Sequence, residues 1–241
     1  MSKAGRPRLL LPWLISVVLA LVAACGAGTN DVVEDLRARN EGLSRVRLFQ
    51  SLPDLLPNRT YILENGKSFT LTQAVVLGTF GDVEPGRAYS AVESPSGVQV
   101  PFDSDDAAWK TFHAHITVSE VIGGDTVAAD QTVGLALSPG RDAGEVEAAL
   151  RELGSVVLFL QTSPVFAYSP GTLGIVADGE LLGQVDADGG ISFPVIESDE
   201  GVPFWARGAT VASLTEEARG PQRQRQLDSA GLTVVSETVV P

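Results

Sequence analysis

The chain has 241 residues, and its 30 acidic residues against 17 basic ones give a formal net charge of −13. This balance argues against nucleic acid as a partner and against direct binding to anionic lipid headgroups, because both attract clusters of Lys and Arg. A hydrophobic content of 44%, with 25 Gly and 14 Pro, favours a folded β-rich domain over a disordered chain.

The first 24 residues have the features of a secretory signal peptide. Three basic residues precede an apolar run from Leu9 to Ala24, and small residues end this run. A positive start, a short apolar stretch and small residues before the cut are typical of such a signal, which we expect to be helical. The run is shorter than the roughly 20 apolar residues that span a bilayer, so a permanent transmembrane helix is the weaker interpretation. Removal of residues 1–24 would leave a net charge of −16.

The signal ends in the sequence Leu21-Val22-Ala23-Ala24-Cys25. This segment resembles the lipobox of bacterial lipoproteins, in which small residues precede an invariant cysteine. The resemblance implies that the Cys25 thiol takes a diacylglyceryl group and that cleavage before Cys25 leaves the protein anchored to the cell membrane, on its extracytoplasmic face. Cys25 is the only cysteine in the chain, so no internal disulfide can form. The alternative is an ordinary cleavable signal with an incidental cysteine.

Residues 25–72 are predicted to form a tether followed by a helical and irregular segment. Small polar residues after Cys25 suit a short linker, and residues 31–43 are expected to form a helix with Asn30 or Asp31 as its cap. Further on, the sequence Glu64-Asn65-Gly66-Lys67 predicts a hairpin turn.

Residues 73–219 are predicted to form the folded domain. The clearest strand covers residues 109–121, where apolar and polar side chains alternate with period two. The other predicted strands cover residues 74–83, 132–137, 156–160, 172–177, 180–185 and 191–195, with 172–177 and 180–185 expected to pair.

Two helices are predicted within this domain. Asp142 can cap a helix over residues 142–153 that ends at Gly154, and Ser213 can cap a short helix over residues 213–219. The remaining residues, 220–241, are polar and are expected to form a flexible tail.

The order of elements predicts a mainly β fold, a small, partly open antiparallel barrel of OB-like type with one inserted helix. Residues 73–195 also resemble a group of uncharacterised exported bacterial domains. The likeness rests on Val118-Ser119-Glu120-Val121 before a glycine turn, and on Gly154 before the strand Leu158-Phe159-Leu160. This resemblance implies no catalytic residues.

The only two histidines, His113 and His115, are candidates for a divalent metal site. Residues two apart on a strand point to the same face, so both imidazoles could reach one ion. Zinc requires three or four ligands, and further ligands could come from Asp103, Asp105 and Asp106 in the preceding loop. The simpler interpretation is two solvated histidines without any cofactor.

Other local patterns have simple structural interpretations. Asp186-Ala187-Asp188-Gly189 resembles the start of a calcium loop, but Gly190 and Glu197 complete the pattern only in part, and a tight turn is favoured. The aromatic residues of Pro203-Phe204-Trp205 are expected to close the barrel core rather than to bind a partner. Arg219, Arg223 and Arg225 form a basic cluster that we expect to be solvated in the tail.

The sequence contains no Gly-x-Ser-x-Gly, Ser-x-x-Lys, His-Glu-x-x-His or phosphate-loop motif. We therefore expect a membrane-anchored, non-enzymatic domain that binds a protein partner at the cell surface. A metal-binding module based on His113 and His115 is one alternative. A hydrolase with a dispersed site that uses one of these histidines is another.

Overall fold

The computed structural model describes residues 30–40, 51–90, 97–196, 206–228 and 233–240. The chain divides into two units, residues 1–30 and 31–241, and every element below belongs to the second unit. The predicted signal helix, Cys25 with its linker, residues 41–43 of the first predicted helix, and Pro203-Phe204-Trp205 lie outside the described residues.

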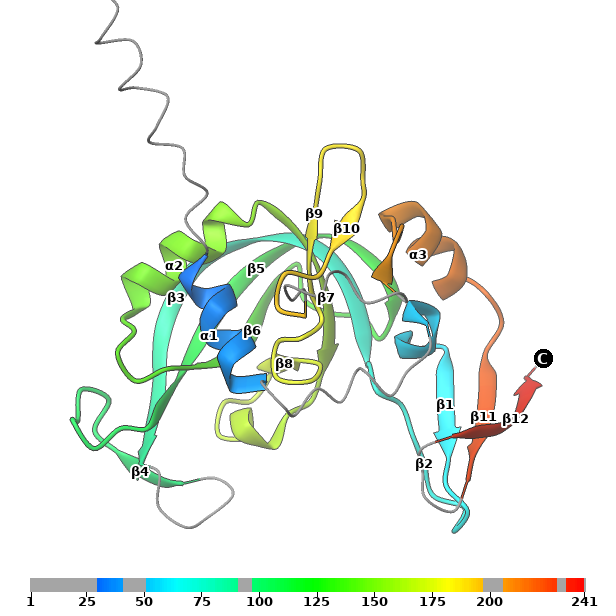
Figure 1. The fold of residues 1–241 in the computed structure, drawn as a ribbon, viewed down its shortest axis with the longest axis horizontal. Coiled ribbons are helices and arrows are strands. Elements are labelled where there is room, and N and C mark those ends of the chain that lie inside the picture. The colour runs from blue at the N-terminus through cyan, green and yellow to red at the C-terminus, as the bar shows by residue number, and fades with distance from the viewer. Residues whose placement is uncertain (1–29, 41–50, 91–96, 197–205, 229–232, 241) are drawn as a thin grey trace, which may run out of the picture. The chain divides into compact units, whose positions relative to one another are not determined.

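Five strands form a closed barrel, and the prediction of a mainly β, OB-like fold is confirmed (Figure 1). The strands are β3 (Ala74–Ser90), β5 (Trp109–Gly124), β6 (Asp130–Leu137), β7 (Ser155–Gln161) and β8 (Leu173–Ile175). Their order around the barrel is β3-β5-β6-β8-β7, and β7 pairs with β3 to close it. Among the pairs of strands that form the barrel, β6 and β8 are parallel and the others are antiparallel. The fold is an OB-like barrel with its inserted helix, α2 (Ala143–Glu152), between β6 and β7.

Strand β3 is longer than the predicted strand over residues 74–83, and it pairs with three other strands. It pairs with β5 along its length, with β7 through its first six residues, and with β4 (Val98–Val100) near its end. Register shifts interrupt its pairing with β5 at four places. At Gly78 an added Cβ would lie 2.5 Å from the Thr117 carbonyl oxygen. Glycine and the bulges therefore let β3 bend around the barrel.

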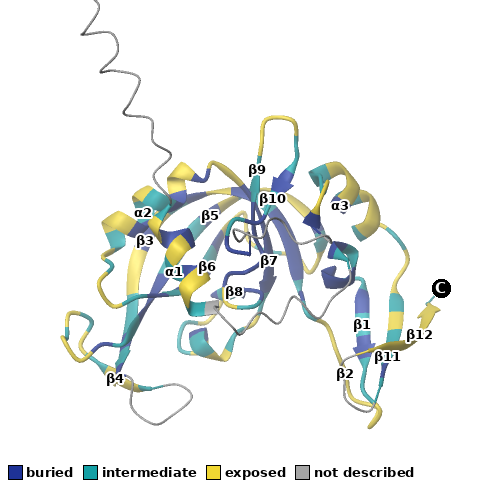
Figure 2. Cartoon of the chain, viewed as in Figure 1, coloured by how far each residue is buried: buried dark blue, intermediate teal, exposed yellow. Residues whose placement is uncertain are grey.

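The barrel core follows from the alternation predicted on β5. Phe112, Ala114 and Ile116 are completely buried in the core, while His113 and His115 between them are only partly buried. Figure 2 shows buried residues, in dark blue, along the strands of the barrel. Helix α2 begins as predicted, because the Asp142 carboxylate accepts a hydrogen bond of 2.9 Å from the Glu145 amide. The described residues also form the helices α1 (Asp31–Asn40), α3 (Val211–Ala218), η2 (Leu52–Leu55) and η3 (Pro164–Phe166). Helix α3 starts earlier than predicted, with Thr210 as its cap instead of Ser213.

The predicted pairing of residues 172–177 with residues 180–185 is wrong. Strand β8 pairs with β6 and β7, whereas β9 (Leu182–Val185) pairs with β7 and with β10 (Ile191–Ser192). Ala177 and Asp178 adopt positive φ angles of 55° and 52°, which turn the chain without forming a hairpin. The chain then continues along the same edge of β7.

The residues after Gly220 do not form the loose tail that we expected. They contribute β11 (Arg223–Leu227) and β12 (Val234–Val239) to a second, four-stranded sheet. Strand β11 pairs in parallel with β1 (Arg59–Ile62), which pairs with β2 (Ser68–Phe69) across the predicted hairpin turn (Figure 1). The second sheet thus joins segments on both sides of the barrel sequence.

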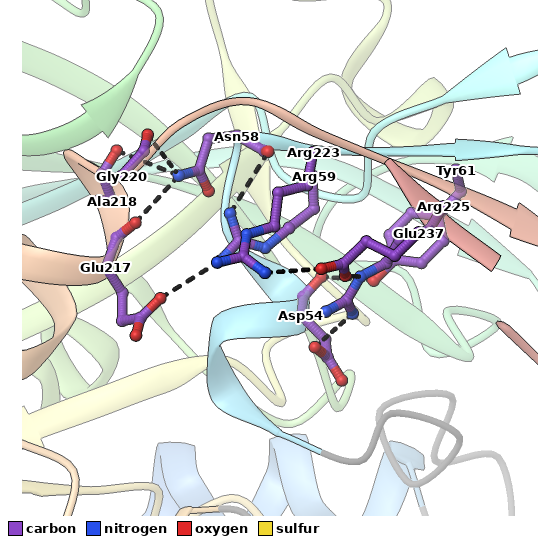
Figure 3. Close-up of polar contacts among 10 residues, drawn as sticks. All are labelled: Asp54, Asn58, Arg59, Tyr61, Glu217, Ala218, Gly220, Arg223, Arg225 and Glu237. Carbon is purple, nitrogen blue, oxygen red and sulfur yellow. Dashed lines mark hydrogen bonds and ion pairs between the residues drawn. The ribbon is translucent and has the colours of Figure 1, made fainter. Parts of the chain in front are cut away.

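Ion pairs explain why a strand as polar as β11 is ordered. Arg225 pairs with Asp54 and Glu237, and Arg223 pairs with Glu237 at 2.6 Å (Figure 3). Nearby, buried Arg59 reaches Glu217 at 3.3 Å. Arg223 and Arg225 of the predicted basic cluster are therefore neutralised in the fold, where charge-assisted hydrogen bonds replace apolar packing, whereas Arg219 is exposed as expected.

We predict that Arg225→Ala will lower the free energy of unfolding by about 2–3 kcal/mol, because it leaves the Asp54 carboxylate buried without its cation. The Arg225 and Asp54 side chains are only 14% and 11% exposed. The matched control, Arg219→Ala, removes a 75% exposed side chain and should cost at most about 0.5 kcal/mol. Urea unfolding measures both values, and equal small losses would contradict an ordered second sheet.

Candidate functional site

The two histidines lie on the outer face of β5, but each has a different partner. His113 Nε2 lies 3.0 Å from the Tyr168 hydroxyl, and the two rings stack with centroids 5.6 Å apart. His115 Nδ1 lies 3.5 Å from an Asp130 carboxylate oxygen. The period-two pattern predicted the shared face correctly, yet the partners come from outside the strand.

Tyr168 is held in place by β3 and β5. Its hydroxyl lies 2.7 Å from Thr111 Oγ1, and the Arg87 guanidinium lies 3.9 Å from its ring centroid. Gly86 makes this approach possible, because an added Cβ would lie 2.4 Å from Thr111 Oγ1 and 2.6 Å from the Tyr168 hydroxyl. Arg87, Tyr168 and His113 thus form a three-membered stack, here called the Tyr168 stack.

The loop between β7 and β8 covers part of the outer face. Phe166 packs on Gly134 of β6, where an added Cβ would meet the Phe166 ring at 2.5 Å. Tyr168, two residues later, covers Thr111 and His113 of β5. OB folds use this face and these loops to bind oligonucleotides or oligosaccharides. In this protein the chain's own side chains occupy much of it.

A pocket of about 200 Å³ remains beside this loop, and Arg39, Trp109, Phe166 and Asp178 contribute to its lining. Trp109 stacks on Tyr89 with ring centroids 4.3 Å apart, and the Arg39 guanidinium lies 5.3 Å from the Trp109 ring. Burial lowers the pKa of Arg39, although the negative charge of Asp178 opposes this shift. The Arg39 Nε atom is buried without a hydrogen-bond partner in the described part of the chain. The pocket therefore offers an aromatic wall, a cation and a carboxylate.

The structure does not assemble the predicted metal ligands. Within the described ranges, no three side chains of His, Cys, Asp or Glu converge on a point where an ion could bind. Asp103, Asp105 and Asp106 belong to the turns before β5, where the Asp106 amide donates to Ser104 Oγ at 3.2 Å. Metal binding by His113 and His115 stays a prediction without a coordination site.

The hydrolase alternative gains no support from the histidine contacts. In the described residues, the polar side-chain contacts of His113 and His115 are to Tyr168 and Asp130, and neither imidazole contacts a serine hydroxyl. A serine nucleophile needs a base within hydrogen-bond reach. Both imidazoles are held on the outer face of β5 by polar contacts, one with a phenol and one with a carboxylate.

The sequence that resembled a calcium loop forms a tight turn between β9 and β10. One Asp186 carboxylate oxygen accepts hydrogen bonds from the amides of Asp188 and Gly190, at 2.9 and 2.7 Å. Gly189 adopts a φ of 80°, which the turn requires. Asp186 thus stabilises the turn through the backbone, as the simpler interpretation expected.

Sequence reasoning missed Tyr168 and Arg39. Tyr168 lies 55 positions from His113, and no local pattern connects the two. Arg39 lies near the end of helix α1, and its neighbours in the pocket come from β5 and from the turn after β8. Only the presence of aromatic residues in a Pro- and Ser-containing loop could have drawn attention to Tyr168.

No protein family model, curated protein or solved structure matches this chain. In the described part of the chain, no helix combines the length and apolar character needed to cross a membrane. Proposals about function therefore depend on the residues and the geometry above.

Burial lowers the pKa of His113 below its ordinary value of 6.5, against the opposing charge of Glu84. The folded protein favours the neutral imidazole of His113. Its contribution to the free energy of unfolding is therefore fully present above pH 6.5 and is lost as the pH falls through the lowered pKa. We predict that one of the two imidazole proton signals titrates below pH 6.5 in NMR spectra, and that it vanishes in His113→Gln.

In the same variant, the loss of unfolding free energy on acidification should be smaller than in the wild type. His115→Gln removes the other imidazole and so identifies which of the two NMR signals belongs to His115. A His113 signal that titrates above pH 6.5 would contradict the buried hydrogen-bonded ring.

Proposed function

We propose that this protein is a non-enzymatic binding domain, anchored to the extracytoplasmic face of a bacterial cell membrane by lipid on Cys25, which binds a protein partner there. One observation supports the binding role most directly. Helix α1, which begins six positions after Cys25, contributes Leu36 and Arg39 to the pocket on the outer face of the barrel. The segment next to the proposed anchor is therefore part of the candidate binding surface.

Helix α1 is fixed to the barrel by charge and by apolar packing. Arg141, just before α2, donates to Asp35 at 2.9 Å and to Asp31 at 3.0 Å. These bonds raise the pKa of Arg141, with Asp35 as the larger cause. Leu36 is 1% exposed and packs so closely on Gly179 that an added Cβ would lie 2.8 Å away. A docked α1 fixes the position of Arg39 in the pocket.

The spacing between the proposed anchor and α1 limits how far the pocket can lie from the membrane. Asp31 follows Cys25 by six positions, and an extended chain of that length spans roughly 20 Å. With lipid on Cys25, the start of α1 stays within that distance of the bilayer surface. The net charge of −16 after cleavage opposes adhesion of the domain to anionic headgroups, which leaves the pocket accessible.

The pocket chemistry suits a peptide surface better than a charged polymer. Trp109 and Phe166 supply apolar area, while Arg39 and Asp178 supply one positive and one negative group. Buried aromatic and arginine residues carry much of the binding energy at protein interfaces. A surface that presents both charges selects a partner by hydrogen bonding instead of by net charge.

Lipid anchoring is tested by Cys25→Ser, which keeps a small polar residue but removes the thiol. Wild-type cells fed an alkyne-tagged fatty acid should yield a labelled protein in the membrane fraction, because Cys25 is the only thiol available. Cys25→Ser should be unlabelled. Thr29→Ser, a conservative change in the same linker, serves as the control and should be labelled normally. A labelled Cys25→Ser protein, or an unlabelled wild type, would contradict the anchor.

Partner binding is tested separately, by placing a photo-crosslinking amino acid at Val165, which lines the pocket. We predict one stoichiometric crosslinked protein in native membranes, which Arg39→Ala reduces at least about fivefold, since loss of an interface arginine costs more than about 1 kcal/mol. The same group at exposed Gln224 on β11 is the control and should capture nothing. No adduct at Val165, or equal adducts at both positions, would argue against this surface as the binding site.

A further inference from the structure

Strand β12 is an exposed edge of the four-stranded sheet, and among the described residues no strand pairs with the side of β12 that faces away from β11. All six of its residues are exposed, and Val234, Val235 and Val239 have exposed fractions of 42%, 60% and 52%. The other edge strands of the two sheets, β2, β4 and β10, have only two or three residues each. Proteins commonly protect an edge by shortening the strand or by placing Lys or Pro in it, and β12 contains neither residue. Its outer side is therefore open to pairing with another strand.

The hydrogen bonds between β12 and β11 determine which backbone groups of β12 point outward. The Val240 amide donates to the Gln222 carbonyl oxygen at 2.8 Å. Backbone groups of successive residues in an antiparallel strand point to opposite sides, so the even-numbered residues that continue this register bond to β11. The N–H and C=O groups of Glu237 and Val239, and the C=O group of Val235, therefore point away from β11. These are the donors and acceptors that a further strand would use.

The sequence of this edge is nearly palindromic. Residues 234–240 read Val-Val-Ser-Glu-Thr-Val-Val, and reversal of this order only exchanges Ser for Thr. When two identical strands pair around a two-fold axis, each residue meets the residue at the mirrored position of the other copy. An axis through Glu237 places Val235 opposite Val239, and Ser236 opposite Thr238. Every side chain then faces one of its own kind, which favours a second copy of this chain over an unrelated strand.

The pairing places the Glu237 carboxylates of the two copies opposite each other, and like charges in that position are normally destabilising. Within each copy, however, Glu237 is held between two cations, Arg223 at 2.6 Å and Arg225 (Figure 3). The hydrogen bond from Arg223 is the largest cause that keeps the pKa of Glu237 below its ordinary value. Arg225 also pairs with Asp54, so two guanidinium groups balance two carboxylates in each copy. The centre of the paired edge is therefore locally neutral, although the whole chain carries −13.

We propose that two copies of this chain associate by antiparallel pairing of their β12 strands around a two-fold axis through Glu237, which joins the two four-stranded sheets into one continuous sheet. The Glu237 amide donates to the Glu237 carbonyl oxygen of the second copy, and the Val239 amide donates to the Val235 carbonyl oxygen of the second copy. A single pair of strands forms a small interface, which belongs to the weak and transient class. The pocket beside Trp109 contains no residue of β12, so this proposal and the proposed partner binding do not depend on each other.

The register is tested by disulfide trapping in the full chain with Cys25→Ser, so that introduced cysteines are the only thiols. One version carries Ser236→Cys and another Thr238→Cys, and the two are mixed with a mild oxidant in detergent at roughly 0.1 mM, where complexes with micromolar Kd form. In the proposed register these two positions form a non-hydrogen-bonded pair with Cα atoms about 4.5 Å apart, within the range of a disulfide. In either version alone the two thiols lie on a diagonal, with Cα atoms about 7–8 Å apart. The covalent dimer should therefore form at least about fivefold faster in the mixture than in either version alone.

Charge changes on the same edge test whether the second occupant is another copy of this chain. Val235→Lys together with Val239→Lys in both versions places ammonium groups opposite each other and should slow trapping at least about fivefold. If one version instead carries Val235→Glu with Val239→Glu, opposite charges face each other, and trapping should return at least to its original rate. This return also shows that the Lys variant is folded. Val98→Lys, on the exposed edge strand β4, is the matched control and should leave trapping unchanged.

Three results would overturn the proposal. The first is a chain that stays monomeric in every mixture, which would leave the β12 edge to a strand of another protein. The second is faster trapping with Ser236→Cys alone than in the mixture, which would require a different register. The third is trapping that the Lys substitutions do not slow, or that opposite charges do not restore.

Discussion

The barrel depends on the ability of one strand, β3, to hydrogen-bond with three neighbours along its 17 residues. A straight strand could not pair with β5 throughout and also reach β7 at one end and β4 at the other. The register shifts and Gly78 provide the bend, since a side chain at Gly78 would strike the Thr117 backbone. Once β3 has closed on β7, β8 fits between β7 and β6, and its parallel pairing with β6 completes the ring.

Closure of the barrel also determines which side chains cover its outer face. The loop that joins β7 to β8 must cross this face, and Gly134 and Gly86 leave room for the Phe166 and Tyr168 side chains. The imidazole of His113 is thereby satisfied by a phenol, and its neighbour Thr111 is completely buried beneath the loop. A face that would be exposed on an isolated barrel is therefore partly covered, and the pocket lined by Arg39 and Trp109 lies beside the covering loop.

Local signals were enough to predict the barrel but not the second sheet. The period-two pattern of β5 and the cap at Asp142 depend on neighbouring residues, so both were predicted correctly. Strand β11, with the sequence Arg-Gln-Arg-Gln-Leu, has no apolar face and looks like a solvated tail. Its order comes from parallel pairing with β1 and from the ion pair of Arg225 with Asp54, 171 positions away. A separation of 55 positions likewise hid Tyr168 from His113.

Some polar groups at the surface of the fold have hydrogen-bond or ring partners within the chain, whereas a few buried polar atoms have none among the described residues. The Tyr168 stack is complete, because its hydroxyl, imidazole and guanidinium all have partners within the fold. Asn58 has a structural reason to be buried, since its amide caps α3, and its unpaired Oδ1 follows from that role. Thr72 has no such reason: valine fills the same volume without the cost of an unpaired hydroxyl, about 1–3 kcal/mol. The Thr72 hydroxyl oxygen has almost no accessible surface, so no group outside the chain reaches it in this fold, and its cost falls on the folded protein itself.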